Sequence, residues 1–184
     1  MVEIELRRNA LERAYREHAD DVYRVAYAIL RDPDAAMDVT QDSFARAFER
    51  WEQYDAARPL RHWLHGIASH GALDALRRRR RAAGHGPVQQ IAVVAAGGDP
   101  GVHAADRELV EDCLASLAPL PRAALVLRHY YGYDYEQIGR LLRTSSGNVG
   151  SIISRAHATL RARLLQAGAL ASHPDDDRLR EAIR

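Results

Sequence analysis

One stretch of this 184-residue chain, from Arg61 to Arg81, combines an aromatic side chain with a row of cations. It begins Arg-His-Trp, ends in five consecutive arginines and contains no proline. Arginine neutralises phosphates and an aromatic ring stacks on an unpaired base, so this chemistry suits a nucleic acid strand. At about 100° per residue, one stripe of the expected helix carries Trp63, His70, Asp74, Arg77 and Arg81. The alternative is a solvated basic helix end whose Trp63 joins the core.

A helix that presents this stripe to a ligand also needs an apolar side. The same spacing predicts that this side is formed by Leu60, Leu64, Ile67, Ala68, Gly71 and Ala75. Two further helices are expected before it, one from about Asn9 to Leu30 and one from about Asp32 to Tyr54. Because the connections are short, the three helices can bury one shared core.

The second of these expected helices is acidic. Asp32-Pro33-Asp34 is typical of a helix start, with Asp32 as the N-cap and Pro33 at the first helical position. Seven acids and two arginines lie between Asp32 and Asp55. The predicted core side carries Phe44, Ala47, Phe48 and Trp51, and the predicted exposed side carries Asp38, Gln41, Asp42 and Glu49. An acidic element beside a basic one indicates two different partners.

The segment from Tyr135 to Ile153 has the pattern of a helix-turn-helix. Ile138 and Leu142 are predicted to face inward, Gly139 is small where two helices approach, and Ser145 is a suitable N-cap for the second helix. The outward residues of that helix are predicted to be Ser146, Asn148, Ser151 and Arg155. Short polar groups with one cation suit a major groove. A helical hairpin without any DNA role is the alternative.

Residues 82–105 are rich in glycine and proline and nearly uncharged, which is typical of a flexible linker. The sequence therefore predicts an all-α fold with two small helical domains, at residues 1–81 and 106–167, and a tail at 168–184. Before the helix-turn-helix, the second domain is expected to contain a helix through Cys113 and Leu117 and another over Ala123–Tyr131.

Composition narrows the class of protein. The net charge is only +1, and Cys113 is the single cysteine, so no internal disulfide forms. The first residues lack the apolar core of a signal peptide and no run reaches the length of a membrane span, so we expect a cytoplasmic protein without membrane insertion. No cofactor is expected. His62 and His65 have a spacing that metal sites allow, but no third ligand accompanies them, so exposed histidines are favoured over a metal enzyme.

Both patterns occur together in one protein family. Asp32-Pro33, Asp38-Val-Thr-Gln41-Asp42-Ser-Phe44 and Leu60-Arg61-His-Trp63-Leu64 through Arg77 resemble region two of the extracytoplasmic-function sigma factors. Leu117 through Leu120-Pro121, Tyr135-Glu136-Gln-Ile138 and Ser145 through Arg155-Ala156 resemble region four. The order, the spacing and the linker match, and the resemblance covers about Leu11 to Leu165.

The resemblance implies a two-domain initiation factor that joins bacterial RNA polymerase to a promoter and catalyses nothing itself. The implied partners are core RNA polymerase, promoter DNA and an anti-sigma factor. The implied contacts with the polymerase clamp helices are Asp38, Gln41 and Asp42. The implied contacts with the minus-ten strand are Arg61, Trp63, His70, Asp74, Arg77, Arg78 and Arg81, beside the loop Tyr54–Pro59. The second domain would bind the polymerase flap and read the minus-thirty-five element through Ser145, Ser146, Asn148, Ser151, Ile152 and Arg155.

The chain also departs from the pattern of this family. His70 stands where the family often has Asn, and Arg143 stands where glycine usually allows a left-handed turn. Gly150 and Ile152 replace residues that are commonly Lys and Arg, which predicts weak binding of the minus-thirty-five element. The other class of protein to weigh is a helix-turn-helix regulator that acts without polymerase, but it leaves the acidic helix and the arginine stripe unexplained.

Overall fold

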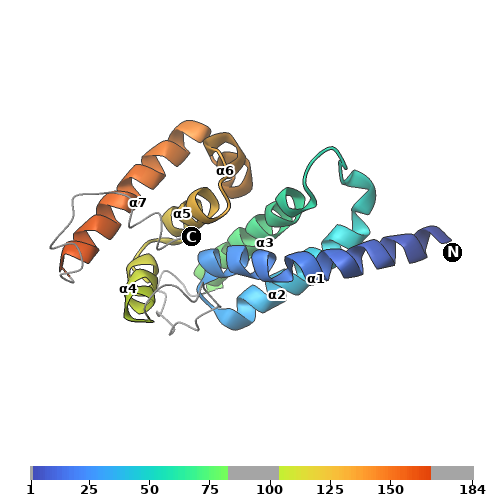
Figure 1. Ribbon diagram of the computed structural model, residues 1–184, viewed down its shortest axis with the longest axis horizontal. Coiled ribbons are helices and arrows are strands. Elements are labelled where there is room, and N and C mark those ends of the chain that lie inside the picture. Colours follow the sequence, from blue (N-terminus) through green and yellow to red (C-terminus); the bar gives the residue numbers. More distant parts are fainter. Residues whose placement is uncertain (1, 83–103, 167–184) are drawn as a thin grey trace. The chain divides into compact units, whose positions relative to one another are not determined.

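The computed structural model describes residues 2–82 and 104–166, and every regular element in those two ranges is helical (Figure 1). The predicted all-α fold is therefore confirmed. The chain divides into two compact units, Met1–Ile91 and Ala92–Arg184. This division falls within the predicted linker, whose residues 83–103 lie outside the described part of the chain, as does the predicted tail at 168–184.

Between residues 2 and 82, the first unit is a bundle of three helices. They are α1 (Val2–Leu30), α2 (Pro33–Glu49) and α3 (Leu60–Ala82), and a 3-10 turn, η1 (Trp51–Gln53), follows α2. Each of the three helices packs on the other two. Their buried side chains include Val22, Val25, Ile29, Phe44, Ala47, Leu64, Ala68 and Leu73. The predicted shared core is confirmed.

The start of α2 is as predicted. Asp32 accepts a hydrogen bond from the backbone N–H of Ala35 at 2.9 Å, and Pro33 is the first helical residue. The second carboxylate oxygen of Asp32 accepts from Arg79 at 2.7 Å, which ties the last turn of α3 to the start of α2. The hydrogen bond from Ala35, followed by that from Arg79, lowers the pKa of Asp32 below its ordinary value.

The sequence predictions for this unit are wrong in four details. α1 begins at Val2 rather than near Asn9, and α2 ends at Glu49 rather than Tyr54. Phe48 was predicted to face the core, yet it is 37% exposed. On α3 the buried face is rotated and wider than predicted: it contains Leu64, His65, Ala68, Ser69, Ala72, Leu73 and Leu76, while Ile67, Gly71 and Ala75 are only half-buried. The reason is that α3 packs on two neighbours, which cover more than one apolar stripe.

Over the described residues 104–166, the second unit contains four helices and one π-helical turn. They are α4 (Ala104–Ala115), α5 (Pro119–Leu125), the π turn η2 (Val126–Tyr130), α6 (Tyr135–Leu142) and α7 (Ser146–Gln166). α7 packs on α4, α5 and α6, so it forms the centre of the unit. The helix predicted over Ala123–Tyr131 is split between α5 and η2, and Gly132 ends it with a positive φ of 71°.

No helix within residues 2–82 and 104–166 carries an apolar stretch that could span a lipid bilayer.

Candidate nucleic-acid and polymerase interfaces

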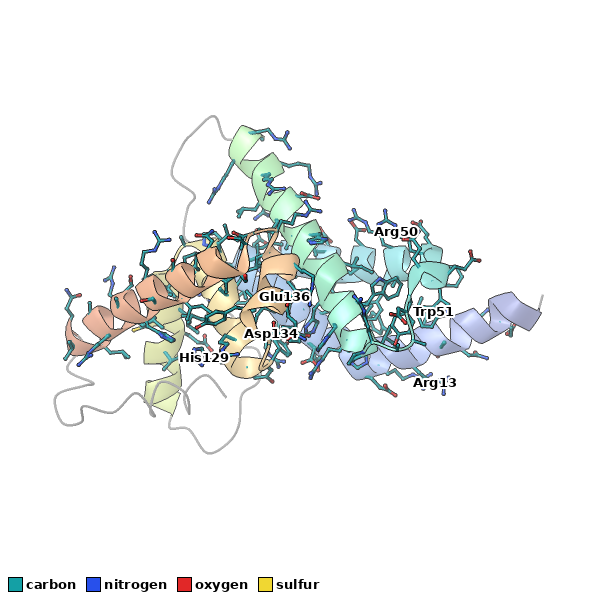
Figure 2. All side chains as sticks on the ribbon, turned by 90° about the horizontal axis from the view of Figure 1, so that it is seen from above. Arg13, Arg50, Trp51, His129, Asp134 and Glu136 are labelled. Atoms are coloured by element: carbon teal, nitrogen blue, oxygen red, sulfur yellow. The ribbon has the colours of Figure 1, made fainter. Side chains whose placement is uncertain are left out.

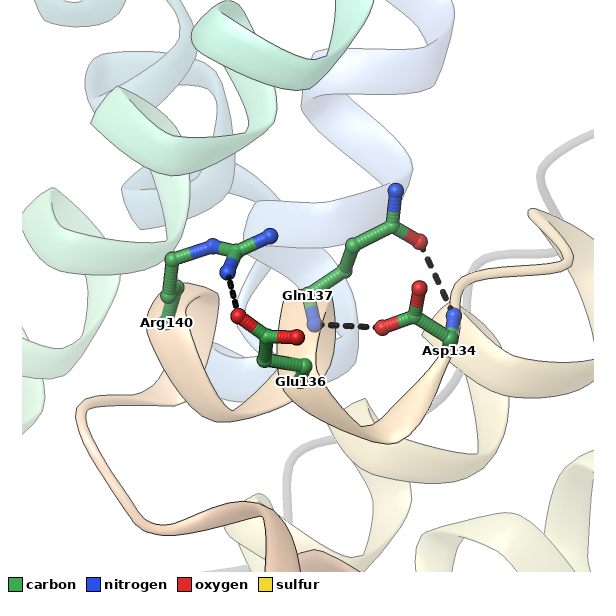
Figure 3. Close-up of polar contacts among 4 residues, drawn as sticks. All are labelled: Asp134, Glu136, Gln137 and Arg140. Carbon is green, nitrogen blue, oxygen red and sulfur yellow. Dashed lines mark hydrogen bonds and ion pairs between the residues drawn. The ribbon is translucent and has the colours of Figure 1, made fainter.

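The predicted helix-turn-helix is formed by α6, a short turn and α7. A capping box starts α6: Asp134 accepts from the backbone N–H of Gln137 at 2.7 Å, and the Gln137 side chain accepts from the backbone N–H of Asp134 at 2.9 Å (Figure 3). Glu136 and Arg140 form an ion pair one turn apart on the exposed side of α6 (Figure 3). This cap is not among the sequence predictions, although Asp134 and Gln137 have the spacing of a capping box.

The turn between the two helices is tight, and it depends on Gly139. A Cβ atom on Gly139 would lie 2.8 Å from the carbonyl oxygen of Thr144 and 3.3 Å from the backbone nitrogen of Ser146. The predicted need for a small residue is confirmed, but the atoms that approach belong to the turn and the start of α7. Arg143 adopts the left-handed conformation, with φ 54° and ψ 49°. That conformation costs a residue with a Cβ roughly 1–2 kcal/mol.

The N-terminus of α7 presents short polar side chains to solvent. Ser145 is the predicted N-cap, and its hydroxyl accepts from the backbone N–H of Asn148 at 3.2 Å. The side-chain amide of Asn148 donates to the hydroxyl of Thr144 at 2.7 Å. Arg155 donates through Nε to the carbonyl of Ser151 at 3.2 Å. The outward orientation predicted for Ser146, Asn148, Ser151 and Arg155 is confirmed, because all four are exposed.

Ile152 does not belong to this exposed surface. Its side chain is only 7% exposed, and it is buried with Val149 and Ile153. The prediction that Ile152 contacts DNA is therefore corrected, because it lies three residues after Val149 and shares its helix face. Gly150 is half-buried, and a Cβ there would lie 3.4 Å from the ring of Tyr135.

In the first unit, Trp63 lies in a cluster of three aromatic rings at the start of α3. Its ring stacks on Tyr54, with centroids 5.2 Å apart, and meets Trp51 edge-on at 6.2 Å. Trp51 comes from η1 and is labelled in Figure 2. All three residues are half-buried, so Trp63 is packed at the rim of the bundle rather than in its core. The hydroxyl of Tyr54 donates to the carbonyl of Arg58 at 2.8 Å and so ties the following loop to the cluster.

The basic end of α3 is exposed and carries its own hydrogen bonds. Arg77 pairs with Asp74 at 3.1 Å, and Arg81 donates to the carbonyl of Arg77 at 3.4 Å. Arg78 is exposed, and Arg61, His70 and Asp74 are half-buried. At about 1.5 Å per residue, Trp63 and Arg81 are about 27 Å apart along the helix axis. The predicted stripe is therefore an extended track along α3, and no compact pocket unites its residues.

The exposed side of α2 carries apolar as well as acidic side chains. Asp38, Gln41 and Asp42 are exposed, as predicted. Met37 and Phe48 are also exposed, by 45% and 37%. Positions 37, 41 and 48 recur at helical spacing, so they line one side of α2. Neither apolar residue belongs to the predicted exposed side: Phe48 is predicted to face the core, and Met37 has no predicted role.

His65 contradicts the expectation of exposed histidines on α3. Its side chain is fully buried, and this burial, followed by the nearby charge of Arg61, lowers the pKa of His65 from 6.5 to about 3. His62 is half-buried. Among the described residues, no group of three His, Cys, Asp or Glu side chains is arranged to hold a metal ion.

Two stretches of the chain match known family models. Residues 14–82 match sigma-70 region 2, and residues 107–160 match region 4. The ECF RNA polymerase sigma factor SigL of Mycobacterium tuberculosis is 35% identical over 162 residues, which cover 86% of this chain and 92% of that protein. The chain belongs to the ECF sigma factors. The first match of this sigma factor contains α2, the aromatic cluster and the arginines, and the second contains the helix-turn-helix.

Other relatives agree with this assignment. The ECF RNA polymerase sigma factor SigE of Mycolicibacterium smegmatis is 37% identical over 150 residues, which cover 79% of this sigma factor and 58% of that protein. The sigma factor RpoE from Bartonella quintana, solved in complex with the anti-sigma factor NepR, has a TM-score of 0.69 at 20% identity and covers 83% of this chain and 95% of its own. That structural likeness supports the fold alone.

A sigma factor acts with RNA polymerase in transcription initiation. This family membership decides against a helix-turn-helix regulator that acts without polymerase.

Proposed function

We propose that the exposed side of α2 docks on core RNA polymerase. Asp38, Gln41 and Asp42 supply negative charge and amide groups, and Met37 and Phe48 supply apolar contact area. A docking surface needs both, since apolar burial supplies affinity and complementary charge supplies orientation. The element that this side of α2 would contact is the pair of polymerase clamp helices, as the family resemblance implies.

The start of α3 and the exposed arginines near its end would hold the non-template strand of the minus-ten element. These arginines, here called the arginine track, are Arg77, Arg78 and Arg81. Trp63 and its neighbours Trp51 and Tyr54 offer ring surface for stacking, because each is only half-buried. Arg77, Arg78 and Arg81 would neutralise phosphates along the same helix, and Arg61 and His70 flank that path. Asp74 would act through Arg77, which it pairs with at 3.1 Å.

The N-terminus of α7 would enter the major groove of the minus-thirty-five element. Ser145, Ser146, Asn148, Ser151 and Arg155 are its polar residues, and Arg155 is the cation among them. Exposed apolar residues of the second unit would contact the polymerase flap; large ones among the described residues are Leu120, Tyr130, Tyr135 and Leu165. We also propose that the protein acts in the cytoplasm and that an anti-sigma factor inhibits it. The polymerase would be the only catalyst of the complex.

The observation that carries the proposal is that one three-helix unit exposes an acidic and apolar side on α2 and an aromatic and arginine-rich track on α3.

Replacing Asp38 and Asp42 together by Lys should weaken binding to core polymerase at least tenfold, because both acids are exposed at the proposed contact. A matched control replaces the exposed acids Glu17 and Asp20 of α1 by Lys, which makes the same change of net charge elsewhere on the unit. Fluorescence titration with core polymerase measures affinity, and circular dichroism checks that both variants remain helical. Equal affinities for wild type and both variants would rule out α2 as the docking helix.

A further inference from the structure

The side chain of Asn148 is held in place by the residue that precedes the N-cap of α7. Its amide nitrogen donates to the hydroxyl of Thr144 at 2.7 Å, and its backbone N–H donates to the hydroxyl of Ser145 at 3.2 Å. Asn148 is exposed, whereas Thr144 is half-buried within the turn. An exposed side chain of the first turn of α7 is thus hydrogen-bonded to a half-buried residue of the preceding turn.

This hydrogen bond determines which groups Asn148 can offer to a ligand. A primary amide has two N–H donors and one carbonyl acceptor. With one N–H engaged by Thr144, the carbonyl oxygen and the second N–H remain as an adjacent acceptor and donor. In the major groove, adenine presents an adjacent acceptor and donor, N7 and the N6 amino group, and guanine presents two acceptors. The remaining amide groups therefore complement adenine.

The other outward residues of α7 lack this selectivity. The hydroxyls of Ser146 and Ser151 rotate and serve as donor or acceptor, so they accept several bases. Arg155 is only a donor, and its Nε already bonds to the carbonyl of Ser151 at 3.2 Å. Of the outward side chains at the start of α7, Asn148 is the one whose groups distinguish adenine from the other bases.

We propose that Asn148 selects adenine at one position of the minus-thirty-five element and that Thr144 is the positioning residue that makes this selection sharp. The inference rests on the proposed function, because it requires that the N-terminus of α7 enters the major groove. Without the Thr144 hydroxyl, the Asn148 amide samples several rotamers. Its acceptor and donor then no longer face the base in one fixed orientation, so the preference for adenine over the other bases becomes smaller.

The test is selection from a library of duplex DNA with a randomised segment, using the full-length chain bound to core polymerase. Wild type should prefer adenine at one position by about 5- to 150-fold, the range for one bidentate contact to a base. Asn148→Ala should abolish the preference at that position alone. Thr144→Val should reduce it severalfold while preferences at the other positions persist, and Thr144→Ser, which keeps a hydroxyl, should restore it.

Thr159→Val is the matched control, because it removes a hydroxyl from the exposed side of α7, the helix that carries Asn148, where Thr159 bonds to the carbonyl of Arg155 at 3.0 Å. Thermal melting shows which variants fold, and Thr144→Ala, which also removes the hydroxyl, covers the case in which Thr144→Val does not. The inference is overturned if the adenine preference survives Asn148→Ala. It is also overturned if the wild-type complex shows preferences at other positions but no adenine preference of this kind. Both outcomes leave the proposed function standing. An undiminished preference in folded Thr144→Val overturns the positioning role. Failure of the complex to select any duplex overturns the proposed function and the inference together.

Discussion

At the scale of single residues, His65 couples the stability of the first unit to pH. The folded unit resists protonation of this buried side chain, whose pKa is lowered to about 3, chiefly by burial. The unfolded chain keeps a pKa near the ordinary value of 6.5, so acid protonates the unfolded state first. The contribution of neutral His65 to the free energy of unfolding of the first unit is therefore fully present above about pH 6.5. It is lost progressively as the pH falls toward 3.

Between pH 7.5 and pH 5, this linkage should lower the free energy of unfolding by about 2 kcal/mol. His65→Gln removes the titrating group and keeps a polar side chain, so its stability should change less over that interval. His70→Gln on the same helix is the control and should retain the wild-type dependence. Both tryptophans lie in the first unit, so urea unfolding followed by tryptophan fluorescence reports on that unit. A pH dependence in His65→Gln equal to that of wild type would contradict this role of His65.

At the scale of elements, the helix-turn-helix depends on the close approach at Gly139. Gly139→Ala places a methyl group 2.8 Å from the carbonyl oxygen of Thr144, and the backbone of the turn has to shift. We expect a loss of about 1–3 kcal/mol in the stability of the second unit, as for other overpacked sites. Gly147→Ala is the matched control, because no atom lies within 4 Å of its added Cβ.

Denaturant titration followed by circular dichroism measures both glycine variants, and tryptophan fluorescence shows that the first unit is unaffected. If Gly139→Ala is as stable as Gly147→Ala, the turn is looser than the structure indicates.

The arginine track of α3 is an electrostatic element, so its effect should depend on salt. Replacing Arg77 and Arg81 by Gln should weaken binding of single-stranded DNA irrespective of sequence. The slope of log affinity against log salt concentration should fall by about 1.4, since each lost phosphate contact on a single strand contributes about 0.7. Replacing the exposed Arg8 and Arg13 of α1 by Gln is the control with the same change of charge. Wild-type salt dependence in the Arg77 and Arg81 variant would show that the track does not bind phosphates.

Elements that follow local rules could be predicted from the sequence. The N-caps at Asp32 and Ser145 and the small residue at Gly139 depend on neighbours a few positions away, and all three are present in the structure. Faces that depend on packing partners could not be predicted. Ile152 was placed on the DNA side although it is buried, and His65 was placed at the surface although it is fully buried. The burial of His65 depends on the two helices that pack against α3, which periodicity within one helix does not reveal. The burial of Ile152 does agree with periodicity, because Ile152 lies three residues after Val149, and only the family resemblance assigns it to the DNA side.

At the scale of the whole molecule, the order of two patterns predicted the family better than either pattern alone. An aromatic and arginine-rich helix, taken alone, is also explained as a solvated basic helix end. A helical hairpin, taken alone, is also explained without any DNA role. An acidic helix, the arginine track and a helix-turn-helix in one chain are all accounted for by a subunit that must contact polymerase and promoter together. The base preferences of such a subunit do not follow from that order, because they depend on side-chain geometry such as the hydrogen bond between Thr144 and Asn148.

The most direct measurement of the central claim is transcription from genomic DNA of the source bacterium by purified core polymerase, with and without the full-length chain. Sequencing of the transcript ends maps where synthesis starts. Addition of the chain should create a set of start sites that share sequence elements near minus ten and minus thirty-five, and the Asp38 and Asp42 double Lys variant should lose most of them. A chain that binds DNA yet creates no new start sites with core polymerase would contradict the account.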